Sequence, residues 1–123
     1  MQCYAIKGFE RFRRRHRISE AALVEAIDRA MRGLIDADLG GGLIKQRVAR
    51  PGQGRRGGYR TIIAFRAGQR AVFLFGFAKN ARDNIAPDDL AHWQLIGADL
   101  MKASEEAIAA AIAVGELTEM HNE

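Results

Sequence analysis

The chain has 123 residues, of which 48% are hydrophobic, and it carries a formal net charge of +4. This length suffices for one compact core but not for two domains of ordinary size, so we expect a single domain over residues 1–123. The one cysteine, Cys3, excludes a disulfide framework within the chain and a thiolate metal site. No apolar stretch approaches the roughly 20 residues of a spanning helix, and the N-terminus lacks a secretory signal pattern, so we expect a cytoplasmic protein that does not enter a membrane.

The first third of the sequence predicts a short strand and two helices. Residues 3–6 have the composition of an edge strand, and residues 9–15 form a basic helical pattern with two phenylalanines on one face. Ser19 is a favourable N-cap for a second helix, whose apolar stripe continues through residues 23–35. Three consecutive glycines at positions 40–42 should end this helix, because glycine loses more backbone entropy on folding than any other residue.

The apolar period then changes from that of helices to that of strands. Residues 43–49, 59–66 and 70–77 alternate as strands do, with a glycine-rich basic loop at 53–57 after the first. A turn at 67–69 joins the last two strands into a hairpin. Alternation sets Arg60, Ile62 and Ala64 on one face and Tyr59, Thr61, Ile63 and Phe65 on the other, and it groups Ala71, Phe73, Phe75 and Phe77 on one face of the next strand.

A polar connection over residues 78–86 leads to the C-terminal helices. Pro87 and the two aspartates after it are typical of a helix N-terminus, because proline suits the first turn and acids complement the helix dipole. Ser104 can cap a shorter helix over residues 105–114, which is followed by Gly115 and an acidic tail. The element order predicts an α+β fold with two N-terminal helices, a small antiparallel β-sheet and a C-terminal helix packed on it.

The charges are distributed unevenly along the chain. Residues 1–44 carry eight lysines and arginines against six acids, residues 45–82 carry ten against none, and residues 83–123 carry one against nine. A segment with ten positive charges and no carboxylate is expected to meet a polyanion, because phosphate contacts relieve its self-repulsion and release counterions. The middle of the chain therefore predicts a nucleic-acid-binding surface.

Three motifs lie in and just after this basic segment. They are IKQRVARPGQG at residues 44–54, GGYRT at 57–61 and GFAKNARDNI at 76–85. In this order and spacing they resemble the RelE-like/HigB-like subgroup of the RelE/ParE superfamily, the toxins of type II toxin-antitoxin systems. The resemblance implies the RelE-like fold, a small curved antiparallel sheet with helices packed on one side. Many members of the superfamily are ribosome-dependent mRNA endonucleases, and each is neutralised by an antitoxin encoded beside it.

The resemblance also implies roles for individual residues. Arg60 matches the strand arginine that contacts the scissile phosphate, and Lys45 and Arg47 match a basic pair on the preceding strand. Lys79 and Arg82 match basic positions that follow the last strand. Further RNA contacts are expected from nearby polar and basic residues, namely Arg50, Arg55, Arg56 and Asn80. The chain departs from the better-known ribosomal nucleases because it has no tyrosine after the sheet, and because Asn80 stands where some relatives are basic.

RNA cleavage without a metal proceeds by attack of the 2′-hydroxyl on its own phosphate, so it needs a base, an acid and positive charge at the developing oxyanion. Crowded cations disfavour each other's charged form, so Lys45 or Lys79 is the candidate for proton exchange. Arg60 and Arg82 stay charged and are the candidates for holding the phosphate. No cluster has metal-ligand spacing and no nucleotide-cradling loop is present, so we expect no metal and no cofactor. The three histidines lie outside the basic segment and are expected to be solvent or interface residues: His16, His92 and His121.

Other basic residues have more than one interpretation. Arg66 and Arg70 flank a turn, where solvated side chains are expected. Arg55 and Arg56 lie in a glycine-rich loop, where phosphate binding and simple solubility both stay open. The basic cluster at residues 11–17 suits either ribosomal RNA or an acidic segment of an antitoxin.

Three functions are compatible with these patterns. The first is a metal-independent endoribonuclease that cleaves mRNA on the ribosome and inhibits translation. The second is a ParE-like inhibitor of DNA gyrase without nuclease activity, against which the basic positions argue because a gyrase binder needs no phosphate site. The third is a non-catalytic RNA-binding module. In each case we expect a cognate antitoxin, with a helix-turn-helix DNA-binding domain, as partner.

Overall fold

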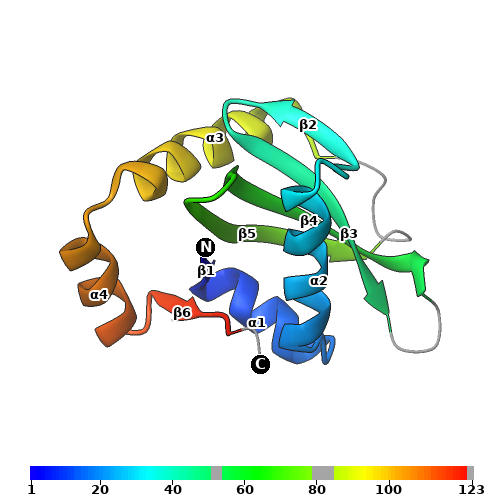
Figure 1. Cartoon of the computed structure of the whole chain (residues 1–123), viewed down its shortest axis with the longest axis horizontal. Coiled ribbons are helices and arrows are strands. Elements are labelled where there is room, and N and C mark those ends of the chain that lie inside the picture. The colour runs from blue at the N-terminus through cyan, green and yellow to red at the C-terminus, as the bar shows by residue number, and fades with distance from the viewer. Residues whose placement is uncertain (51–53, 79–84, 122–123) are drawn as a thin grey trace.

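The computed structural model of the chain describes residues 1–50, 54–78 and 85–121, and of residues 54–57 the backbone alone. The expected α+β class is confirmed by the order of elements (Figure 1). These are β1 (Gln2–Ile6), α1 (Lys7–Arg15), α2 (Glu20–Met31), β2 (Ala37–Gly40), β3 (Leu43–Arg50), β4 (Gly54–Arg66), β5 (Arg70–Ala78), α3 (Pro87–Lys102), α4 (Glu105–Ala113) and β6 (Leu117–Glu119).

One six-stranded sheet, in the order β2-β3-β4-β5-β1-β6, forms the centre of the structure (Figure 1). β1 runs parallel to β5, and the other neighbouring strands are antiparallel. The sheet is therefore mixed, whereas a purely antiparallel sheet was expected. The N-terminal strand was expected at an edge, but it lies between β5 and β6 because part of the expected acidic tail forms β6 and covers it.

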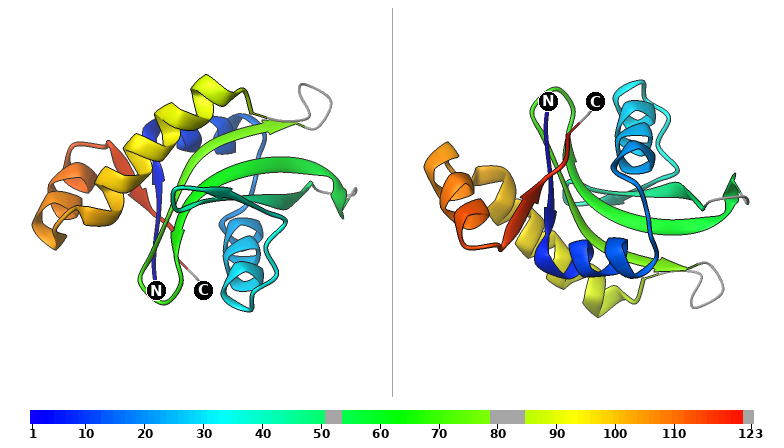
Figure 2. Two further views of the ribbon diagram at one scale, coloured as in Figure 1. Left: turned by 90° about the horizontal axis from the view of Figure 1, so that it is seen from above. Right: turned by 90° about the horizontal axis from the view of Figure 1, so that it is seen from below.

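Helices cover both faces of the sheet, and α2 and α3 lie on opposite sides of it (Figure 2). One hydrophobic cluster joins α1 and α2 to the sheet through Phe9, Leu23 and Phe73. A second joins α3 and α4 to it, with Leu43, Ile62 and buried side chains of β5 at its centre. None of the helices in the described ranges is long and apolar enough to cross a membrane.

α2 begins at its predicted cap and ends earlier than predicted. The Ser19 hydroxyl accepts a hydrogen bond from the amide of Ala22 at 3.1 Å, which confirms the cap. The helix stops at Met31 because Gly33, with φ of 83°, forms a Schellman turn: its amide donates to Ala30, and the amide of Leu34 donates to Arg29. The apolar stripe expected to continue to position 35 is therefore wrong at its end, and Leu34 is 56% exposed.

The glycines at 40–42 turn a hairpin and do not end a helix. They all have positive φ, and they connect β2, which was not predicted, to β3. The expected loop at 53–57 is also partly wrong, because β4 begins at Gly54 and pairs there with Arg50. Both errors have the same cause: glycine-rich sequence favours turns locally, and cross-strand pairing overrides that preference.

A bulge in β5 changes which phenylalanines share a face. Ile62 pairs with Phe75 and Ile63 with Phe73, so Leu74 is the extra residue on β5. Phe73 consequently belongs to the cluster under α1 and α2, while Phe75 and Phe77 belong to the cluster under α3. The expected single stripe of phenylalanines along β5 is wrong for this reason.

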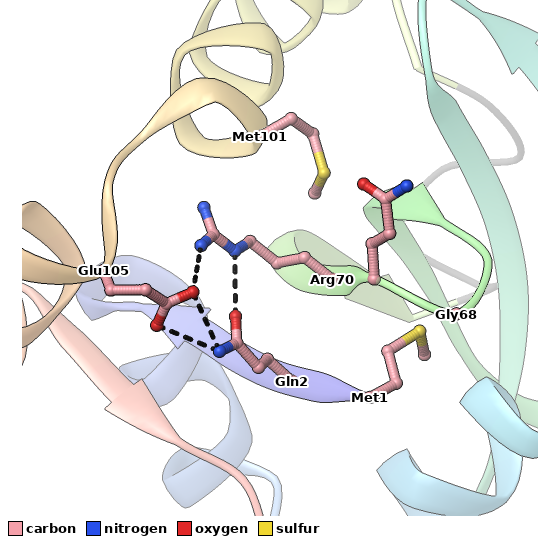
Figure 3. Close-up of a pocket in the computed structure, with 7 residues that line it drawn as sticks. Met1, Gln2, Gly68, Arg70, Met101 and Glu105 are labelled. Carbon is pink, nitrogen blue, oxygen red and sulfur yellow. Dashed lines mark hydrogen bonds and ion pairs between the residues drawn. The ribbon is translucent and has the colours of Figure 1, made fainter.

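Arg70 was expected to be solvated, and it is a buried clamp between β5 and the junction of α3 and α4. Its side chain donates to the main-chain oxygens of Leu100 at 2.6 Å and Ala103 at 2.9 Å, which lie at the carboxyl end of α3. Its other nitrogens donate to Gln2 and pair with Glu105, both at 3.3 Å (Figure 3). The guanidinium thus satisfies carbonyls that a helix end leaves unpaired.

We predict that Arg70→Met lowers the free energy of unfolding by about 2 kcal/mol, because the hydrogen bonds of a buried guanidinium are lost together. Urea unfolding of the whole chain measures this. Arg66→Met is the matched control, since Arg66 lies on the same hairpin and is exposed. Equal stabilities of the two variants would show that Arg70 does not hold α3 and α4 in place.

Candidate functional site

Three predicted site residues gather on one face of the β3–β4 pair. Arg47 lies directly opposite Arg60, and Lys45 lies opposite Ile62. Because opposite residues of an antiparallel pair point to the same face, Lys45, Arg47 and Arg60 form one group of cations, which we call the β3–β4 cation cluster. It continues the face that carries Leu43 and Ile62, the face that α3 covers.

Arg60 is the buried member of this cluster. It is 8% exposed, and its Nη1 atom is buried without a hydrogen-bond partner. Arg47 lies beside it on β3, and Phe77, also buried, lies beside it on β5. A buried guanidinium nitrogen without a partner is energetically unfavourable, so its retention calls for an explanation, and an anionic ligand would satisfy it.

The described carboxylates pair with other arginines of the chain and not with this cluster. Within the described residues, the ion pairs of arginine are Arg13 and Arg14 with Glu10, Arg29 with Glu25 and Asp36, and Arg70 with Glu105. No described carboxylate pairs with Lys45, Arg47 or Arg60. The positive charge of the cluster is therefore available to a ligand.

Two side chains hold the main chain of Arg47 from the outer edge of β3. β2 pairs with β3 only as far as Lys45, so the next outward-facing groups of β3 have no strand partner there. The Asp36 carboxylate accepts a hydrogen bond from the amide of Arg47 at 2.6 Å, and Arg29 donates to the carbonyl of Arg47. Arg29 and Asp36 also form an ion pair at 3.5 Å. This pair replaces a neighbouring strand and fixes the backbone from which Arg47 extends.

Gln46 anchors the same segment to α2. It is fully buried, and its Nε2 donates to the carbonyls of Ala26 at 2.9 Å and Leu34 at 3.2 Å. Its Oε1 accepts from the amide of Asp36 at 2.7 Å. Sequence analysis missed Arg29, Asp36 and Gln46 as supporting residues. The stretch around Asp36 was assigned to a helix, and no local pattern reports these contacts.

The opposite face of the same strands carries an aromatic cluster. The His16 ring lies between Phe12, at 4.5 Å, and Tyr59, at 5.0 Å, and Arg50 lies over the Tyr59 ring at 5.8 Å. The expectation that His16 is a solvent or interface residue is only partly met, because it is a half-buried packing residue. Arg50, predicted to bind RNA, is on a different face from the β3–β4 cation cluster, since Tyr59 and Arg60 are consecutive on one strand.

The remaining predicted site residues are not placed. Lys79, Asn80 and Arg82 lie outside the described residues, and so do the side chains of Arg55 and Arg56.

In the described ranges, no three acidic, histidine or cysteine side chains gather in a way that would hold a metal ion. A pocket lined by Met1, Gln2 and Arg70 among others lies at the opposite end of β5 from Phe77, and the hydrogen bonds of the Arg70 clamp form part of its wall (Figure 3).

Glu10 pairs with two of the arginines of α1. It is buried, and Arg13 donates to it at 2.9 and 2.5 Å while Arg14 donates at 3.0 Å. These hydrogen bonds, that of Arg13 above all, lower the pKa of Glu10. Arg13 also donates to the carbonyl of Ile18, so it closes the turn after α1.

We predict that this carboxylate makes the fold sensitive to acid. A carboxyl whose pKa is lowered on folding stabilises the fold at pH values above its unfolded-state pKa, and the stabilisation is lost as the pH falls through the folded-state value. Urea unfolding between neutral and acidic pH should therefore show a larger loss of stability for the natural chain than for Glu10→Gln. Parallel pH profiles for the two proteins would contradict this role.

A family model described as the RelE toxin of the RelE/RelB toxin-antitoxin system matches residues 1–120 of the chain. No curated protein matches the sequence.

We predict that Asp36→Ala loosens β3 at Arg47. Loss of a charged acceptor should cost about 1.5–3 kcal/mol and speed amide exchange at Arg47. Hydrogen–deuterium exchange resolved to residues 46–48 measures the effect. Asp38→Ala is the control, because the exposed Asp38 carboxylate accepts a hydrogen bond from Gly40 within β2 and does not contact Arg47. Unchanged protection of Arg47 in Asp36→Ala would rule out the anchoring role.

Proposed function

The chain belongs to the RelE family of toxins from toxin-antitoxin systems, and on this premise we propose that it is a metal-independent endoribonuclease that cleaves mRNA on the ribosome and so inhibits translation. Toxins of this family are generally endoribonucleases. The observation that carries the proposal for this chain is the buried Nη1 of Arg60, which has no hydrogen-bond partner among the described residues and lies in a group of cations that no described carboxylate pairs with. We place this activity in the cytoplasm, where mRNA and ribosomes are found.

The proposed chemistry uses the 2′-hydroxyl of the RNA as nucleophile. That oxygen attacks the adjacent phosphorus, the bond to the 5′-oxygen breaks, and one proton leaves the 2′-hydroxyl while another reaches the 5′-oxygen. Arg60 and Arg47, side by side, bind the phosphate oxygens and stabilise the extra negative charge of the transition state. Lys45 lies on the same face and is the described candidate for proton exchange. Lys79 and Arg82 stay candidates for the same roles on the basis of the sequence motif.

The cluster also favours cleavage over the two alternatives. A gyrase inhibitor without nuclease activity would gain nothing from a buried arginine whose Nη1 has no hydrogen-bond partner among the described residues. An RNA-binding module would tolerate any cation at position 60, whereas a phosphate held by a guanidinium requires its planar pair of donors. The same set of variants distinguishes the nuclease from the gyrase inhibitor and from the RNA-binding module.

We predict that Arg60→Ala and Arg60→Lys both abolish cleavage. The assay is primer extension on an mRNA in a reconstituted translation reaction, with and without ribosomes. Arg66→Ala, on the same strand and exposed, should cleave like the natural chain. New 5′ ends that require ribosomes and Arg60 support the proposal.

Other outcomes select the alternatives. Intact mRNA together with inhibition of gyrase supercoiling would favour the ParE-like function. RNA binding that survives Arg60→Lys, without any cleavage, would favour the binding module.

The melting temperature gives a second, independent test of the role of Arg60. Because the buried guanidinium of Arg60 has no carboxylate partner among the described residues, Arg60→Met should leave the melting temperature unchanged or raise it while cleavage is lost. A large fall in melting temperature would instead mean that Arg60 supports the fold.

A further inference from the structure

A groove lies between α1 and α3 over the end of β5. Its volume is about 370 Å³, and its lining comes from both helices and from three consecutive residues of β5. β4 pairs with one side of β5 here, but on the other side β1 pairs with β5 only as far as Ala5 and Phe73, so no described strand continues on that side. The chain turns into α1 there instead. The α1–α3 groove is thus a consequence of the short β1 strand.

The floor of the groove is apolar and aromatic. Phe75 stacks on Trp93 with ring centroids 5.9 Å apart, and Trp93 is half-buried. Phe12 packs directly over Gly76, where an added Cβ would lie 2.4 Å from the Phe12 ring. Gly76 is therefore required for the close approach of α1 to β5, and this approach shapes the wall of the groove.

The rim of the groove carries two exposed arginines on one side of α1, Arg11 and Arg15. They are four residues apart, so their like charges are neighbours on the helix and repel each other. The carboxylate nearest in the sequence, Glu10, is occupied by Arg13 and Arg14. No described acid pairs with Arg11 or Arg15. The rim therefore suits an acidic partner.

We propose that the α1–α3 groove is a docking site for an acidic amphipathic segment of the cognate antitoxin. Apolar side chains of that segment would occupy the floor over Phe75 and Trp93, and its carboxylates would pair with Arg11 and Arg15. The volume accommodates a few apolar side chains, and the charge complements the rim. Membership of a toxin-antitoxin family supplies the partner, and the inference does not depend on the chemistry proposed for Arg60.

The groove is connected to the β3–β4 cation cluster by a row of aromatic rings. Trp93 contacts Phe75, Phe75 lies 5.9 Å from Phe77, and Phe77 pairs with Arg60. A segment held in the groove is therefore adjacent to the cluster without occupying it. Loss of binding at the groove and loss of cleavage at the cluster can be measured as separate effects.

The test is isothermal titration of the whole toxin chain with its purified cognate antitoxin. We expect the double variant Arg11→Glu/Arg15→Glu to weaken binding by about 100-fold, because two attractive charge contacts become repulsive. Trp93→Ala should also weaken binding, because the floor loses its largest side chain. The matched control is Arg32→Glu/Arg66→Glu, which changes the net charge equally at exposed positions outside the groove and should bind like the natural chain.

Three results would overturn the proposal. The first is natural affinity of the antitoxin for Arg11→Glu/Arg15→Glu in a variant whose melting temperature is unchanged. The second is an equal loss of affinity in the control, which would indicate a general charge effect. The third is natural antitoxin affinity combined with weaker RNA binding, which would make the groove a site for a nucleobase stacked on Trp93. Hydrogen exchange that slows at residues 8–15 and 74–76 on antitoxin binding would support it.

Discussion

The pairing of Arg47 with Arg60 across β3 and β4 is the constraint that the surrounding structure has to satisfy. Two like charges directly opposite each other destabilise a sheet, and burial of one of them adds to the cost. Other interactions must therefore hold the two strands in this register. Arg29 and Asp36 fix the main chain of Arg47, Gln46 ties β3 to α2, and hydrophobic clusters on both faces hold β4 between β3 and β5. The surrounding fold keeps these cations together.

Two groups of arginines can be distinguished among the described residues by the partners that they have. Arg13, Arg29 and Arg70 are at least partly buried, and each bonds both a carboxylate and a main-chain carbonyl, so they join elements of the fold. Arg47 and Arg60 have no described carboxylate partner. A positive surface for nucleic acid requires cations of the second kind, because an arginine that already has an internal partner gains less from a phosphate. Net charge alone does not distinguish the two groups of arginines, whereas their hydrogen-bond partners do.

The two proposed sites place RNA cleavage and antitoxin binding on different parts of the surface. In our proposals, the β3–β4 cation cluster binds the phosphate of the RNA. The α1–α3 groove, with its apolar floor and cationic rim, binds an acidic segment of the antitoxin. An aromatic row along the end of β5 connects them. A segment bound in the groove would lie beside the cations, so its binding would not require Lys45, Arg47 or Arg60 to rearrange.

The sequence by itself determined the features that depend on neighbouring residues. Ser19 and Ser104 cap their helices, Pro87 begins α3, and strand alternation places Arg60 on the face opposite Tyr59. The family motifs also identified the basic residues that the β3–β4 register then brings together. Only the tertiary structure decided the parallel position of β1, the strand β6, the bulge at Leu74, and the contacts that bury Arg70 and hold Arg47. These features join residues far apart in the chain, and local propensity carries no information about which distant carbonyl, carboxylate or strand edge will meet a given side chain.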